Sequence, residues 1–196
     1  LRLALDLLLN GSLFFPDDYL FEGSDGLWHS WLHSTHFSAA ERDACRAQIL
    51  TTYEAARSTL LNADVLVVTM GSSHAYMHRE RGHVVGNCHK ENAQTFSEIV
   101  LSVDDIVEKW TPLLEDLQRE VPRLKVVFTV SPDRYAKYGF HESQLAKATL
   151  LLAIDALCKA QANASYFPAY EIVVDELRDY RFYKEDMLHP SPQAAA

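Results

Sequence analysis

The sequence predicts an α/β domain in which helices pack on a parallel sheet. Two short, mostly apolar runs, 63–70 and 124–130, have the length and β-branched composition of strands buried in such a sheet. Longer segments with the apolar spacing of amphipathic helices lie between and after them. Parallel strands need crossover connections, and these are right-handed, so the alternation of the two kinds of segment indicates a layered α/β fold.

Three elements are expected before residue 63. Residues 2–10 have the pattern of the end of an amphipathic helix, stopped at Asn10-Gly11. Residues 12–37 are rich in Trp, His, Phe and Gly without a clear period, which indicates a loop over the surface or over a site. Ser38-Ala-Ala-Glu41 has the pattern of a capping box and predicts the start of a helix that continues to Asn62.

The later elements alternate between strand and helix. Residues 63–70 should form a strand that is buried on both faces and central in the sheet. A helix should start at Ser102, which has Asp105 three residues on in the spacing of a cap. Residues 142–161 predict another helix, and the apolar segment 165–167 a third parallel strand.

Ligands of parallel sheets bind beyond the carboxyl ends of the strands. In this chain those ends are followed by Gly71-Ser72-Ser73 and by Ser131-Pro132-Asp133-Arg134. A glycine there lets backbone N–H groups approach a substrate oxygen, so Gly71, Ser72 and Ser73 are candidates for an oxyanion hole. A plain turn at the strand end explains the same residues equally well. Arg134 is a candidate for substrate binding.

Length, composition and charge limit the classes of protein to which this chain could belong. A chain of 196 residues with 48% hydrophobic residues suits one domain, 1–196, with a substantial core. A net charge of −9 argues against nucleic acid as a partner, and no apolar run reaches the roughly 20 residues of a membrane span. Cys45, Cys88 and Cys158 stand far apart, which predicts reduced thiols and favours a cytoplasmic location. We expect no cofactor and no metal; the oligomeric state is not indicated.

The most informative motif is Asp186-Met187-Leu188-His189, followed by Pro190. A carboxylate three residues before an imidazole can hold the ring through Nδ1 and leave Nε2 to take a proton from a nucleophile. The proline disfavours helical backbone at His189 and stiffens the turn. The other interpretation of this spacing is a turn in which the aspartate only caps backbone N–H groups.

Other polar clusters have weaker patterns. Asn87 and His89, near Gly86, are candidates for binding substrate or orienting a loop, and the adjacent Cys88 makes a Cys/His nucleophile conceivable. Two groups of histidines have the four-residue spacing of metal ligands on a helix, although both lie in segments expected to be loops. These groups are His29, His33 and His36, and His74, His78 and His83.

Several strings together resemble the GSCFA family, a bacterial group related to the SGNH hydrolases, and they span nearly all of the chain. The matching strings are Gly26-Leu-Trp28-His-Ser30, His33-Ser34, Phe37-Ser38, residues 63–71, Tyr76, Gly86-Asn-Cys-His-Lys90, residues 128–132, Arg134, Lys147-Ala148 and residues 166–191.

The resemblance implies a three-layer α/β/α fold with an SGNH-hydrolase-like, flavodoxin-like parallel sheet. It implies that Asp186 and His189 are the partners of a nucleophilic serine, and that this serine belongs to a Gly-Ser-Cys-Phe-Ala string before residue 1. The domain would then be incomplete at its N-terminus, and we expect the same at its C-terminus. Gly11-Ser12-Leu13-Phe14 imitates that string but follows a helix, so Ser12 is not expected to be the nucleophile.

These observations predict a serine-esterase-like hydrolase acting on ester or acyl groups, with O-acetyl esters of carbohydrates as one class. His189 would be general base and then general acid, and Asp186 would orient it. The alternative is a catalytically altered SGNH-fold domain that binds a ligand or a partner. The SGNH resemblance implies a glycine and an asparagine as oxyanion donors. The alternative is motivated by the lack of that asparagine in the loop after Gly71 and by the residues at Arg134-Tyr135, which depart from the family's pattern.

Overall fold

The computed structural model describes residues 2–10 and 17–195. Contacts divide them into two compact units. The first contains the described residues through Ala63, together with His74–Val100 and Arg119–Val121. The second contains Asp64–Ser73, Leu101–Gln118 and the described residues from Pro122 onward. Ser12 lies outside the described residues. None of the helices in the part of the chain that the structure describes is long and apolar enough to cross a membrane.

The second unit is built on a parallel sheet with strand order β3-β7-β8. Its elements in chain order are β3 (Val65–Met70), α3 (Val103–Glu120), β7 (Lys125–Val130), α4 (Phe140–Ala160), β8 (Ala164–Tyr166), α5 (Ala169–Glu171), the π-helical turn η5 (Ile172–Leu177), the 3-10 turn η6 (Tyr180–Phe182) and α6 (Pro192–Ala195). The last two residues of α3 are assigned to the first unit. Both α3 and α4 are crossovers between neighbouring parallel strands. This confirms the predicted parallel α/β sheet.

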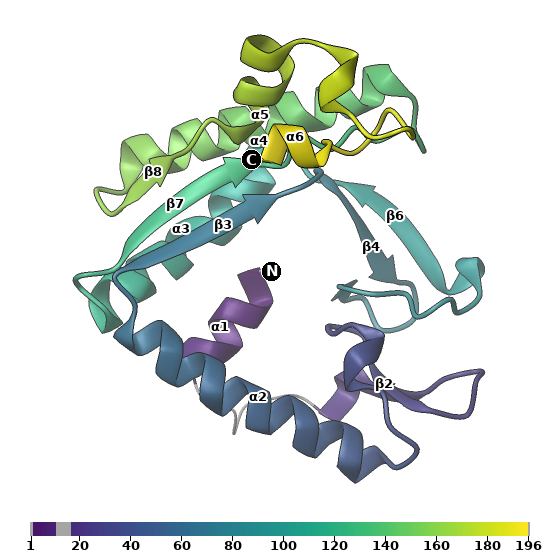
Figure 1. The fold of residues 1–196 in the computed structure, drawn as a ribbon. Coiled ribbons are helices and arrows are strands. Elements are labelled where there is room, and N and C mark those ends of the chain that lie inside the picture. The colour runs from purple at the N-terminus through teal and green to yellow at the C-terminus, as the bar shows by residue number, and fades with distance from the viewer. Residues whose placement is uncertain (1, 11–16, 196) are drawn as a thin grey trace. The chain divides into compact units, whose positions relative to one another are not determined.

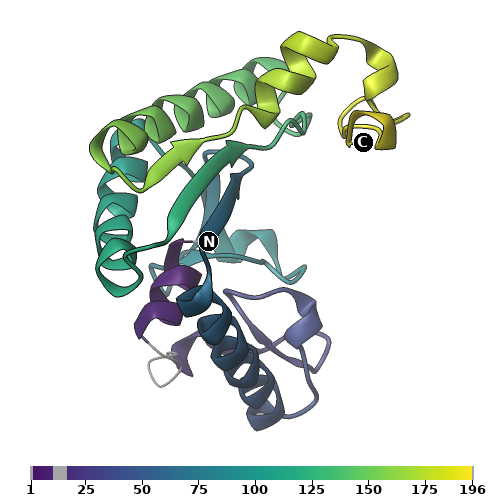
Figure 2. The same cartoon turned by 60° about the vertical axis from the view of Figure 1, so that its left-hand side comes forward.

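One face of this sheet carries the core. Val126, Phe128 and Val130 of β7 are fully buried, and the Phe128 ring meets Trp110 of α3 edge to face with centroids 5.3 Å apart. Figures 1 and 2 show α3 and α4 on the same side of the strands, as right-handed crossovers in one direction require. The helices therefore form one layer against the sheet.

The prediction that residues 63–70 form a central strand buried on both faces is wrong. Among the strands that the structure describes, β3 pairs with β7 alone, so β7 is the central strand of the three. Val65 and Val67, on one face of β3, are 54% and 62% exposed. Neither α3 nor α4 covers that face, so the three-layer arrangement is not established by the described residues.

The first unit contains the expected helices and two small antiparallel sheets. Its elements are α1 (Arg2–Asn10), η2 (Asp17–Tyr19), β1 (Leu20–Glu22), β2 (Trp28–Ser30), η3 (Thr35–Phe37), α2 (Arg42–Asn62), β4 (His74–His78), β5 (Val84–Val85), η4 (Ala93–Thr95) and β6 (Phe96–Val100). β1 pairs with β2, and β4 lies between β5 and β6. The expectation that residues 12–37 and the segment with His74 and His78 are loops is therefore wrong where these strands form.

The two predicted helix caps have different outcomes. Before α3, Asp105 donates its N–H to Ser102 Oγ and accepts the N–H of Ser102 at 2.8 Å, which confirms the capping box. Before α2, the N-cap residue is Glu41. The predicted cap at Ser38 is wrong, because the Ser38 hydroxyl lies 2.6 Å from His29 Nδ1 instead.

Candidate active site

Asp186 and His189 are in direct contact. Oδ2 of Asp186 lies 2.6 Å from Nδ1 of His189. The other carboxylate oxygen, Oδ1, accepts the N–H of Leu188 at 2.8 Å and that of His189 at 3.0 Å. Three hydrogen bonds thus fix the carboxylate within its own turn. The ring is oriented through Nδ1, and Nε2 is the nitrogen left for proton transfer.

The surroundings of this pair are polar and open. The side chain of His189 is 53% exposed and that of Asp186 42% exposed. The N–H groups of His189 and Leu188, together with the His189 ring, hold the pKa of the Asp186 carboxyl well below its usual range. The carboxylate therefore stays ionised throughout the pH range in which an imidazole titrates, as an orienting group must.

Arg134 links the turn to the carboxyl end of β7. Its main-chain N–H donates to the carbonyl of Leu188 at 2.9 Å, and its Nη1 donates to the carbonyl of Met187 at 3.1 Å. The guanidinium also lies over the ring of Tyr183, 5.5 Å from the centroid. The pair is consequently held at the edge of the sheet where ligands of parallel sheets bind. These contacts give Arg134 a positioning role in addition to the binding role considered for it.

The backbone of the turn is strained at one residue. Met187 has a φ of 59°, in the left-handed region, which costs a residue with a side chain about 1 kcal/mol. The bond from Met187 N–H to the Lys184 carbonyl and the bond from Arg134 hold this conformation. Such strain persists only where neighbouring contacts impose it.

The loop after β3 is held by a lysine from α4. Nζ of Lys147 donates to the carbonyl of Gly71 at 2.5 Å and to that of Ser131 at 2.7 Å, which joins the ends of β3 and β7. A Cβ at Gly71 would meet no atom within 4 Å, so the space beside Gly71 is open. Ser72 is half-buried, whereas the Ser73 hydroxyl is fully buried and inaccessible to a substrate. Within this loop, the backbone around Gly71 is the part that a substrate oxygen could reach.

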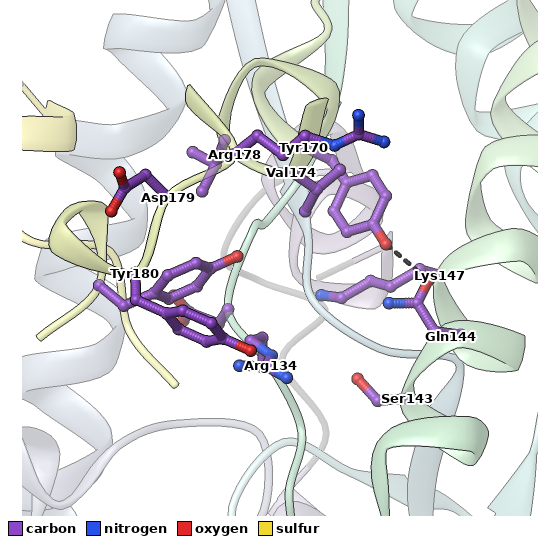
Figure 3. Close-up of a pocket in the computed structure, with 12 residues that line it drawn as sticks. Arg134, Ser143, Gln144, Lys147, Tyr170, Val174, Arg178, Asp179 and Tyr180 are labelled. Carbon is purple, nitrogen blue, oxygen red and sulfur yellow. Dashed lines mark hydrogen bonds between the residues drawn. The ribbon is translucent and has the colours of Figure 1, made fainter. Parts of the chain in front are cut away.

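A cavity of about 270 Å³ lies in the same unit (Figure 3). It is lined by Asp133, Arg134, Ser143, Gln144, Lys147, Tyr170, Val173, Val174, Arg178, Asp179, Tyr180 and Tyr183. Two of these residues, Arg134 and Tyr183, belong to the surroundings of the Asp186–His189 turn, because Arg134 bonds to it and Tyr183 pairs with Pro190. The cavity and the turn therefore share a wall.

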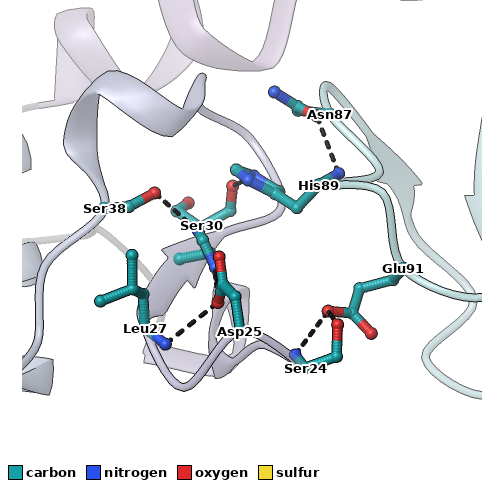
Figure 4. Close-up of polar contacts among 9 residues, drawn as sticks. Ser24, Asp25, Leu27, Ser30, Ser38, Asn87, His89 and Glu91 are labelled. Atoms are coloured by element: carbon teal, nitrogen blue, oxygen red, sulfur yellow. Dashed lines mark hydrogen bonds and ion pairs between the residues drawn. The ribbon is translucent and has the colours of Figure 1, made fainter.

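Asn87 and His89 belong to the first unit, whereas Asp186, His189 and Arg134 belong to the second. Asn87 Oδ1 accepts the N–H of His89 at 2.8 Å, and His89 Nε2 lies 2.8 Å from the carbonyl of Ser30 (Figure 4). The His89 ring is buried, and burial lowers its pKa. Both side chains hold a loop of the first unit in place.

A hydrogen-bonded chain of Asp25, His29 and Ser38 lies in the first unit and was not predicted. Oδ1 of Asp25 is 2.9 Å from His29 Nε2, and His29 Nδ1 is 2.6 Å from Ser38 Oγ (Figure 4). The residue types are those of a catalytic triad, but the His29 side chain is only 3% exposed and both ring nitrogens are engaged. These hydrogen bonds join the β1-β2 hairpin to the segment before α2, so a structural role accounts for them.

The other histidines considered as metal ligands also contact protein groups. His33 Nδ1 lies 2.8 Å from Ser30 Oγ and its Nε2 3.0 Å from the hydroxyl of Tyr53, and burial lowers the pKa of His33 to about 4. His74 Nδ1 lies 2.7 Å from Glu98. Within residues 2–10 and 17–195, no three His, Cys, Asp or Glu side chains are grouped as metal ligands.

Lys147 and the tyrosines of the cavity were missed as site residues. In the sequence, Lys147 stands out only as part of the family resemblance, because a lysine in a helical segment is usually on the surface. Its contact with Gly71 spans 76 positions of sequence. One signal was present: Lys147 occupies the apolar side of α4, between the buried Ala146 and Leu150.

Comparisons with known proteins give a family and no individual relative. The model of the GSCFA family matches residues 1–196. Neither a curated protein nor a solved structure matches the chain.

Proposed function

The chain belongs to the GSCFA family, and from that premise we propose that it is a serine-esterase-like hydrolase acting on ester or acyl groups, including O-acetyl esters of carbohydrates. The finer architecture that goes with this proposal is the three-layer SGNH-like fold. His189 is its general base and acid, and Asp186 is the residue that orients it. The nucleophile is the serine of the Gly-Ser-Cys-Phe-Ala string, which the resemblance assigns to a segment before residue 1.

The observation that carries the proposal is the 2.6 Å contact between Asp186 Oδ2 and His189 Nδ1. It is supported by the position of the turn, which Arg134 attaches to the segment after β7. A turn that served only as a cap would need the bonds from Asp186 to the backbone and not the one to the ring. The accessible Nε2 edge of an exposed imidazole is what a nucleophile from another segment requires.

The mechanism follows the roles of a serine triad. His189 Nε2 would take the proton of the serine hydroxyl as its oxygen attacks the ester carbonyl. The imidazolium would then give that proton to the leaving alcohol, leaving an acyl-enzyme. Water, deprotonated by His189, would release the acid and restore the serine. Asp186 stabilises the positive charge on the ring in both steps and keeps the proton on Nδ1.

Charge on the carbonyl oxygen would develop beside the loop after β3. Backbone N–H groups around Gly71 are the proposed donors, since the space there is open. Lys147 would contribute indirectly, because it fixes the carbonyl of Gly71 and hence the orientation of this loop.

Fluorophosphonate labelling of the full-length protein tests the proposal. The wild-type protein should be labelled on one serine, and the variant His189→Gln should label at least about 100-fold more slowly, because the hydroxyl loses its base. Mass spectrometry of the labelled peptide identifies the serine.

Ser38→Ala is the matched control, because Ser38 is the serine that contacts His29 in the other Asp-His-Ser arrangement. It should label like the wild type. Equal labelling of the wild type and His189→Gln would remove His189 from the proposed role, and a label on Ser38 would move the site to the first unit.

A further inference from the structure

The cavity of the second unit contains a buried ammonium group. Lys147 is only 2% exposed, and Figure 3 shows its side chain reaching from α4 toward the middle of the cavity, opposite Tyr180. Its two hydrogen bonds go to the carbonyls of Gly71 and Ser131. An ammonium has three N–H donors, so one is left for a group in the cavity.

This positive charge has no ion-pair partner among the described residues. Its hydrogen-bond acceptors are neutral carbonyls, and Asp133 acts on it only by longer-range attraction. Burial lowers the pKa of Lys147 to about 8, which leaves the group mostly protonated at neutral pH. A buried charge is stable only when it is paired or well hydrogen-bonded, and a negative group in the cavity would complete the arrangement.

We propose that the cavity binds a small hydroxylated carboxylate, a molecule of the size of a sugar acid, whose carboxylate pairs with Lys147. The cavity volume of about 270 Å³ is close to the lower end, about 300 Å³, of pockets that hold small ligands. It therefore suits a ligand of roughly one sugar ring.

The remaining walls suit hydroxyl groups and a ring. Asp133 and Asp179 supply acceptors, Arg178 supplies donors, and the Tyr170 hydroxyl is held by Gln144 at 2.7 Å. The lining contains three cationic side chains and two carboxylates, a formal net charge of +1, which one carboxylate balances and a doubly charged phosphate exceeds. The chemistry therefore favours a carboxylate over phosphate.

This binding does not require hydrolysis, and it goes beyond the proposed esterase activity. If both hold, the shared wall at Arg134 and Tyr183 would place the bound acid beside the Asp186–His189 turn. The ligand would then be the charged part of an ester substrate or the acid released from it. If the serine is not labelled by the fluorophosphonate, the binding measurement still tests the cavity. If the cavity does not bind the acid, the labelling experiment still tests the proposed hydrolase.

Isothermal titration calorimetry with two matched probes tests the proposal. D-glucuronate and D-glucose differ only in the carboxylate, so glucuronate should bind at least about tenfold more tightly near neutral pH, as expected for one charge-assisted hydrogen bond. Inorganic phosphate should bind more weakly than glucuronate. No binding of glucuronate, equal binding of glucuronate and glucose, or tighter binding of phosphate would overturn the assignment.

Variants locate the binding. Lys147→Met should abolish the preference for glucuronate, and Lys159→Met, which removes an exposed ammonium from the same helix, should retain it. Arg178→Gln removes a positive charge from an exposed side chain of the cavity wall and should weaken the binding of glucuronate about threefold more than that of glucose. If Lys147→Met does not fold, the comparison of Arg178→Gln with the wild type serves as the test. Unchanged glucuronate binding in every folded variant of these two residues would contradict the site.

Discussion

Replacing Asp186 with asparagine is expected to lower the turnover of an acetyl ester by the full-length protein on the order of a thousandfold. The amide can still accept the N–H groups of Leu188 and His189 through its oxygen, so the turn should keep its shape. Its NH₂ group would face Nδ1 of His189 and select the tautomer with the proton on Nε2. That nitrogen could then no longer accept the proton of a serine.

Glu185→Gln is the matched control for this substitution. It removes the same charge from the neighbouring exposed residue, and its turnover should stay within about twofold of the wild type, as for a screened surface charge. Thermal unfolding of both variants shows whether the fold is intact. Turnover of a folded Asp186→Asn protein at the wild-type rate would mean that the contact with His189 serves only the structure of the turn.

The largest loss of stability is expected from Phe128→Ala, at about 4 kcal/mol. Phe128 is fully buried on the central strand and meets Trp110 of α3, so truncation leaves a cavity between the sheet and its helix layer. Denaturant unfolding, followed by tryptophan fluorescence, measures the change.

Phe167 provides the comparison, because it is the same residue type just after β8 and is 51% exposed. Phe167→Ala should change the free energy of unfolding by no more than about 1 kcal/mol. Similar losses in the two variants would contradict the assignment of the core to the face of β7 that carries Phe128.

The sequence predicted the parts of the fold that depend on local composition. The buried residues of β7 and the capping box of α3 are short-range patterns, and the structure reproduces both. The place of β3 in the sheet depends instead on which strands pair with it, and nothing in residues 65–70 reveals that one side has no partner among the described strands. The antiparallel strands β4 and β6 were missed for a similar reason, since the pairing of His78 with Phe96 is not local.

The same distinction explains the candidate site. Asp186 and His189 are three residues apart in one turn, so spacing alone suggested their contact. Lys147 meets Gly71 and Ser131 only because α4 crosses the ends of two strands. At Ser38 the local pattern was misleading. Its sequence predicts a helix cap, but its hydroxyl contacts His29 instead, a residue that only the folded hairpin brings close.

The most direct test of the proposed proton transfer is the tautomer of His189, measured by ¹⁵N NMR of the neutral imidazole. The geometry predicts a protonated Nδ1 facing Asp186 and an unprotonated Nε2, with this preference lost or reversed in Asp186→Asn. A wild-type ring that carries its proton on Nε2 would contradict the account, because His189 could not then act as the base for a serine.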